Sequence, residues 1–126
     1  MKGQIYLSLT TVIFLLSVFF VRPEKTNSAA CNIYIPNVFS PNGDGVNDTF
    51  LPQSNCTFQT YDFKVFDRWG SLIFQTNNET QGWNGTHRGS NAESAAYVYV
   101  LNYTMQDTTG AEVFPEKEVG TVSLVR

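Results

Sequence analysis

The densest cluster of oxygen-bearing side chains in the sequence lies between Ser40 and Phe50, in the stretch SPNGDGVNDTF. A hard cation such as Ca²⁺ takes oxygen ligands from carboxylates, amides and main-chain carbonyls, and the two glycines of the stretch let the backbone bring such groups together. The spacing therefore predicts a calcium-binding loop, with weak Ca²⁺-dependent stabilisation of the domain. The predicted ligands are Asn42, Asp44, Asn47 and Asp48.

The same residues also suit a tight turn that needs no metal. Asn-Gly and Asp-Gly pairs favour turns, and Asp and Asn side chains accept hydrogen bonds from nearby backbone N–H groups. The stretch lacks the terminal glutamate and the flanking helical patterns of an EF-hand. A structural turn and a calcium loop are therefore both open at the level of the sequence.

The sequence shows no recognisable set of catalytic residues. The one histidine, His87, lies in a polar connection beside Thr86 and Arg88, and no nucleophile or second metal ligand adjoins it. A histidine base needs such a partner, so His87 is predicted to be a solvated loop residue. We therefore expect a protein that is not an enzyme.

The N-terminal residues have the order of a segment that directs export. Lys2 precedes an uncharged apolar run from Ile5 to Val21, and the polar stretch after it ends in small residues just before Cys31. This order predicts a secretory signal peptide over residues 1–30. A retained membrane anchor and lipidation of Cys31 are the alternatives.

Removal of that segment leaves residues 31–126, which are enough for one domain with a modest core. They carry 5 basic and 10 acidic side chains, a net charge of about −5. We expect no binding to nucleic acid, because phosphates attract clusters of Lys and Arg. Cys31 and Cys56 are the only cysteines, and an even pair in an exported chain predicts a disulfide between them.

The elements that position these groups have the period of β-strands. In YDFKVFDRWG the residues Tyr61, Phe63 and Val65 alternate with a mixed second set, and SLIFQT follows directly. This predicts a hairpin with its turn at Trp69 and Gly70. The stretches AAYVYVLNYTMQD and KEVGTVSLVR predict two further strands. No sustained helical period occurs, so the predicted fold class is all-β, an immunoglobulin-like antiparallel β-sandwich.

The aromatic side chains allow two interpretations. Trp69, Trp83 and Tyr97 are candidate stacking platforms of a small surface adhesion or carbohydrate-binding module. Alternatively they fill the core, because a domain of this size needs large side chains to bury enough apolar area. For Trp83, which stands alone in a polar connection, we expect insertion into the core.

Five motifs in order resemble the C-terminal sorting domain of the type IX secretion system, in its type B or gliding motility-associated form. They are PNVFSPNGDGVNDTF, YDFKVFDRWGSLIF, GWNG, AYVYVLNY and the terminal GTVSLVR, and the resemblance runs from about Ile35 to Arg126, nearly the whole of residues 31–126. The resemblance implies a non-catalytic β-sandwich carried by exported proteins of Bacteroidetes-type bacteria. Such a domain is the address that the outer-membrane translocon reads after passage of the protein through the inner membrane.

The resemblance also implies partners and a location. The partners are components of the type IX translocon, and the outer membrane is contacted in transit or by surface attachment. The protein is then secreted or displayed on the cell surface via the periplasm. A free-standing domain and a part of a longer exported protein are both compatible with the sequence.

The last strand is the expected recognition surface. An exposed terminal strand and a terminal charge suit docking to the edge or groove of a receptor. The residues expected to carry recognition are Gly120, Val122, Leu124 and Arg126.

Overall fold

The computed structural model describes residues 30–111 and 115–126. The predicted signal peptide, residues 1–30, lies outside the described residues except for Ala30. Within the described ranges, no helix is long and apolar enough to cross a membrane. The regular elements in these ranges are all strands, which confirms the predicted all-β class.

The strands differ greatly in length, and only four of them exceed two residues. These four, β4, β5, β8 and β9, form the body of the main sheet. In chain order the strands are β1 (Ile33–Tyr34), β2 (Val38–Phe39), β3 (Gln53–Ser54), β4 (Thr57–Phe66), β5 (Leu72–Thr76), β6 (Thr86–His87), β7 (Ser90–Asn91), β8 (Ala96–Gln106) and β9 (Glu116–Leu124).

The main sheet has five strands in the order β2-β9-β8-β4-β5. β4 pairs antiparallel with β5 and β8, and β8 pairs antiparallel with β9. β2 runs parallel to β9, with Phe39 opposite Leu124. The sheet is therefore mixed, which corrects the expected purely antiparallel arrangement. Almost the whole domain lies between β2 and β9 in the sequence, and a connection of that length permits parallel pairing where a tight hairpin does not.

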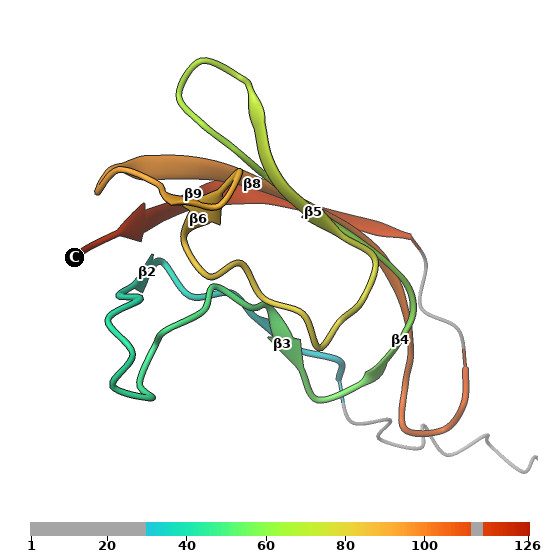
Figure 1. Ribbon diagram of the computed structural model, residues 1–126. Helices are drawn as coiled ribbons and strands as arrows, with labels where there is room; N and C mark the ends of the chain where they lie inside the picture. Colours follow the sequence, from blue (N-terminus) through green and yellow to red (C-terminus); the bar gives the residue numbers. More distant parts are fainter. Residues whose placement is uncertain (1–29, 112–114) are drawn as a thin grey trace, which may run out of the picture.

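A second layer covers one face of this sheet (Figure 1). It contains the segments that carry β1 and β3 and the connection that carries β6 and β7. The only strand pairs among the described residues of this layer are β1 with β3 and β6 with β7. The regular second sheet of an immunoglobulin-like sandwich is therefore not confirmed, because the cover is mostly irregular chain.

The hydrophobic core lies between the sheet and this cover. The cover contributes Phe50 and Trp83, of which Trp83 is fully buried, as predicted, and β2 contributes Phe39. Phe50 and Trp83 also exchange backbone hydrogen bonds of 2.8 and 3.0 Å, which join two parts of the cover. The sheet contributes alternate residues of β4, β8 and β9, namely Tyr61, Phe63, Val65, Tyr97, Leu101, Tyr103, Met105, Val122 and Leu124.

The hairpin between β4 and β5 has the predicted turn. Its bend is held by Asp67, whose Oδ1 accepts hydrogen bonds of 2.9 Å from the backbone N–H groups of Trp69 and Ser71. Gly70 has a φ angle of 80°, which a side chain would disfavour. In Figure 1 the hairpin projects at the top of the view, away from the cover, and the residues of its turn lie at the surface.

Candidate recognition surface

The last strand is enclosed near its C-terminal end. On one side β9 pairs with β8 along almost its whole length. On the other side, the N–H group of Ser123 donates to the carbonyl oxygen of Asn37 over 2.9 Å, and that of Val125 donates to Phe39 over 3.0 Å. The C-terminal part of β9 therefore has backbone partners on both sides, β8 on one and the β2 segment on the other.

The first half of β9 has a free edge. Backbone N–H groups point alternately to the two sides of a strand, so those of Lys117, Val119 and Thr121 point the same way as that of Ser123. β2 begins opposite Ser123, and no other described strand pairs with this side of β9. The side chain of Val119 is 57% exposed there. An edge of this kind can accept a further strand.

Two of the predicted recognition residues lie in the core. Val122 is fully buried and Leu124 is 2% exposed, so both stabilise the strand and neither offers a side chain to a partner. Gly120 faces the ring of Tyr99, and a Cβ atom there would lie 2.5 Å from the Tyr99 hydroxyl oxygen. The prediction that this face of β9 contacts a partner is therefore wrong. The residues that face solvent are the alternate set, Lys117, Val119, Thr121, Ser123 and Val125.

The terminal Arg126 is bound to the domain by three backbone carbonyl groups. Its Nη2 donates to Gly85 over 2.7 Å, while Nη1 donates to Pro41 and Nε to Ala92, each over 3.4 Å. Gly85 and Ala92 flank the β6–β7 hairpin and are hydrogen-bonded to each other, whereas Pro41 follows β2. The charge that was predicted to face a partner therefore has a structural role, because its donors bind the chain's own backbone.

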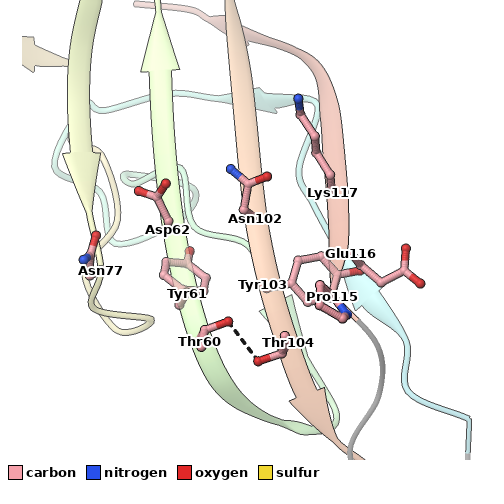
Figure 2. A pocket seen from close by; sticks show the side chains of 10 residues that line it. All are labelled: Thr60, Tyr61, Asp62, Asn77, Asn102, Tyr103, Thr104, Pro115, Glu116 and Lys117. Carbon is pink, nitrogen blue, oxygen red and sulfur yellow. Dashed lines mark hydrogen bonds between the residues drawn. The ribbon is translucent and has the colours of Figure 1, made fainter.

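A row of polar side chains crosses the outer face of the sheet beside the free edge (Figure 2). Asp62 of β4 lies opposite Asn102 of β8, which in turn lies opposite Lys117 of β9. Two pairs along, on the same face, the hydroxyl groups of Thr60 and Thr104 are hydrogen-bonded at 2.8 Å. These side chains line an open depression of about 450 Å³ that reaches the start of β9.

Asp62 gives this row a fixed negative charge. Lys64 Nζ lies 2.7 Å from Asp62 Oδ2, and Gln75 donates to Oδ1 over 3.2 Å. The hydrogen bond from Lys64 lowers the pKa of Asp62 below its ordinary value. Because both side chains are about one third exposed, the ion pair contributes at most about 1 kcal/mol to stability. Its main effect is to hold the charges in a defined pattern.

Sequence reasoning did not identify this row as a unit. The alternation in β4 separates Asp62 and Lys64 from the core-facing set. However, the register that brings Asn102 and Lys117 beside them is a long-range property. The one local signal of the row was Asn102, a polar residue in the middle of the strand AAYVYVLNYTMQD.

The oxygen-rich loop is organised around the carboxylate of Asp48. Its Oδ1 accepts hydrogen bonds from the N–H groups of Asn42 and Gly43, at 3.1 and 2.8 Å. Its Oδ2 accepts one of 2.7 Å from Gly45. The bond from Gly45 is the largest cause of a lowered pKa at Asp48, and the bond from Gly43 comes next.

The remaining predicted calcium ligands also face the backbone of the loop. Asn42 Oδ1 accepts the N–H of Asp44 at 3.0 Å, and Asp44 Oδ1 accepts that of Val46 at 2.8 Å. Asn47 has a φ angle of 52°, and its carbonyl accepts the N–H of Ser40. In the described parts of the chain, no group of three or more His, Cys, Asp or Glu is placed to hold a metal. The hydrogen bonds therefore account for the loop as a turn, and the calcium alternative stays a prediction.

Cys31 and Cys56 form the predicted disulfide, with their Cα atoms 5.5 Å apart. The bond joins the chain that leads into β1 to the residue before β4. It occupies the sulfur of Cys31, which is the atom that lipidation would modify. The structure therefore favours the predicted disulfide over lipidation of Cys31.

The three candidate stacking aromatics have different surroundings. Trp83 and Tyr97 lie in the core, at 0% and 5% exposure, whereas Trp69 is 81% exposed in the turn between β4 and β5. A cavity of about 330 Å³ lies beside Trp69. His87 lines this cavity and is partly buried, with Nδ1 3.1 Å from the carbonyl oxygen of Ile73, which corrects the predicted solvated position.

The family model described as "CHU_C Type IX secretion signal domain" matches residues 33–118. The matched range contains β1 to β8 and the start of β9, and thus most of the sheet and its cover. No curated protein and no solved structure matches the chain.

Proposed function

The chain belongs to the CHU_C family of type IX secretion signal domains, and from this premise we propose that residues 31–126 are a non-catalytic address for export across the outer membrane. The family match supports a sorting role and an interaction with the type IX secretion system. Our proposal adds that the translocon binds the domain directly in the periplasm. The exported product is then secreted or attached to the cell surface.

The free edge of β9 carries the proposal. Natural proteins usually cover or charge the edges of their sheets to prevent unwanted pairing. Here the β-branched residues Val119 and Thr121 lie on a stretch of edge that no described strand pairs with, after the charged Glu116, Lys117 and Glu118. A strand of the translocon can add to this edge through main-chain hydrogen bonds, which provide affinity without a side-chain pocket.

The polar row supplies the specificity of that interaction. Asp62, Asn102 and Lys117 lie side by side across the outer face, and Lys117 itself belongs to the free edge. A partner strand that pairs with β9 therefore lies directly beside Lys117, while Asn102 and Asp62 follow on the next two strands of the same face. Complementary charges on the partner fix the register of pairing and exclude other strands.

A reporter fusion tests the export function. The reporter is placed between a cleavable signal peptide and residues 31–126, and the fusion is expressed in a bacterium that has the type IX system. We expect the reporter in the medium or on the cell surface, and in the periplasm of a strain without the translocon. Retention in the periplasm of both strains would reject the targeting role.

A pair of substitutions at one position tests the edge. Thr121→Pro removes an edge N–H group and obstructs strand addition, whereas Thr121→Val keeps the N–H group and is the matched control. We expect export to fall at least about tenfold for the proline variant, which corresponds to roughly 1.4 kcal/mol of lost binding. Thermal melts of both proteins show whether the domain stays folded. Equal export of the two folded variants would show that the translocon does not bind the free edge of β9.

A further inference from the structure

The exposed side chain of Trp69 belongs to a second surface, at the hairpin end of the sheet. A single exposed aromatic residue is ordinary on a protein surface and is no site by itself. Here, however, the Asp67 hydrogen bonds fix the turn that carries the indole. The cavity of about 330 Å³ adjoins it, and this volume lies within the range of small-molecule sites. The exposed ring thus forms one wall of a defined recess.

The recess has a mainly apolar floor and a polar rim. Ile73, Ala95 and Tyr97 line the floor together with the half-buried His87. The Tyr97 hydroxyl donates to the carbonyl oxygen of Glu93 over 2.8 Å, and its ring packs against Trp83 with centroids 4.8 Å apart. This part of the floor is therefore anchored in the core. The polar groups of the rim are those of Arg68, Ser90, Asn91 and Glu93.

The charges of the recess favour a neutral ligand. Asp67 and Glu93 are acidic. Among the described residues that line the recess, Arg68 is the one Arg or Lys, and it already has partners. Its guanidinium lies 5.6 Å from the centroid of the Trp69 ring and 3.9 Å from Glu93 Oε2. An anionic ligand would therefore meet a net negative surface. The amide of Asn91 and the hydroxyl of Ser90 both donate and accept, which suits a ligand rich in hydroxyl groups.

We propose that this recess binds a neutral saccharide whose ring stacks on Trp69. The C–H groups along one face of a sugar ring are weakly positive and attract the negative face of the indole. The sugar hydroxyls then bond to Ser90 and Asn91 on the rim. This binding is independent of the export role, and it attaches the exported domain to polysaccharide outside the cell.

The two tryptophans allow a direct test by fluorescence, because Trp69 is exposed and Trp83 is buried. Protein purified from the periplasm with its disulfide intact is titrated with cellohexaose, xylohexaose, maltohexaose and mannohexaose. Oligogalacturonate is the anionic comparison. We expect at least one neutral oligosaccharide to protect Trp69 from acrylamide quenching, with calorimetry supplying the dissociation constant.

Substitutions connect that binding to the recess. Trp69→Ala should weaken it at least about tenfold, the loss expected for one aromatic stacking contact together with its buried area. Tyr34→Ala is the matched control, because Tyr34 is also exposed, at 66%, and does not line the recess. Melting curves confirm that both variants are folded. The proposal is overturned if no neutral oligosaccharide binds, if folded Trp69→Ala binds as well as the wild type, or if oligogalacturonate binds more tightly.

Discussion

The guanidinium of Arg126 donates a 2.7 Å hydrogen bond from Nη2 to the carbonyl oxygen of Gly85, 41 positions earlier in the sequence. Gly85 has a φ angle of 76°, and its missing side chain leaves space that Pro41, Leu124 and Arg126 occupy. The contact closes the corner where β2 meets the end of β9. The free edge lies at the other half of β9, so the stability of the corner and recognition at the edge can be tested separately.

The crowding around Gly85 predicts a large effect of adding one methyl group. In Gly85→Ala the Cβ atom would lie 2.9 Å from Pro41 Cγ and 3.0 Å from Leu124 Cδ1. We expect the free energy of unfolding to fall by about 3 kcal/mol, from overpacking together with the unfavourable φ angle. Urea denaturation measures the change.

Gly89→Ala is the matched control for that substitution. Gly89 has a φ angle of 79°, and a Cβ atom there would meet nothing within 4 Å. It should therefore lose only the backbone contribution, about 1 kcal/mol. Equal losses in the two variants would show that the close approach at Gly85 has no energetic role.

The contacts of Arg126 predict a structural effect of its removal. Arg126→Met keeps most of the aliphatic stem and loses the hydrogen bonds to Gly85, Pro41 and Ala92. We expect a loss of about 1 kcal/mol of stability, and no loss of export below the temperature at which the variant unfolds. Melting curves and the reporter assay measure the two effects. Abolished export with unchanged stability would instead show that the terminal charge contacts the translocon.

The disulfide predicts a measurable contribution to stability. Cys31 and Cys56 are 25 positions apart, and a closed loop of that size stabilises a domain by roughly 3 kcal/mol through constraint of the unfolded chain. Urea denaturation with and without reductant should show this difference. Intact mass should rise by about 2 Da on reduction, as expected for one disulfide. An acyl mass on Cys31 would contradict the bond.

The hydrogen bonds to Asp48 predict a dependence of stability on pH. Because backbone N–H groups, first that of Gly45, lower its pKa in the folded state, the contribution is present above the unfolded value of about 3.9. It is lost as the pH falls through the lower folded value. In thermal melts, the wild type should exceed Asp48→Asn in midpoint at neutral pH, and the difference should shrink in acid. A difference that stays constant down to about pH 2, below the ordinary carboxyl range, would contradict this.

The arrangement of the same loop predicts the outcome of calcium addition. The side-chain oxygens of Asn42, Asp44 and Asp48 already accept backbone N–H groups, so we expect equal melting midpoints in chelator and in millimolar Ca²⁺. A rise with calcium that disappears in the double variant Asp44→Asn, Asp48→Asn would establish the calcium alternative. Binding would then be of the weak extracellular kind, with Kd about 10⁻⁴ to 10⁻³ M.

Several features of this protein follow from local sequence alone. Strict alternation in YDFKVF requires Tyr61, Phe63 and Val65 to share one face, and only an apolar face can be buried, so β4 and its hairpin were predictable. A lone tryptophan in a polar connection has one favourable location, and Trp83 lies in the core. The disulfide was predictable from the cysteine count, because the sequence has only two cysteines. The all-β class was predictable from the two-residue period of its apolar side chains.

Tertiary structure decided what the last strand presents to a partner. In GTVSLVR both alternating sets contain valine, so the local pattern does not show which set is buried. The choice depends on the register with β8, which puts Val122 opposite Tyr97 in the core and leaves Val119 at the free edge. The row from Asp62 to Lys117 and the carbonyls around Arg126 also join residues far apart in sequence. Such contacts are set by the packing of the whole domain, because no short segment contains both partners.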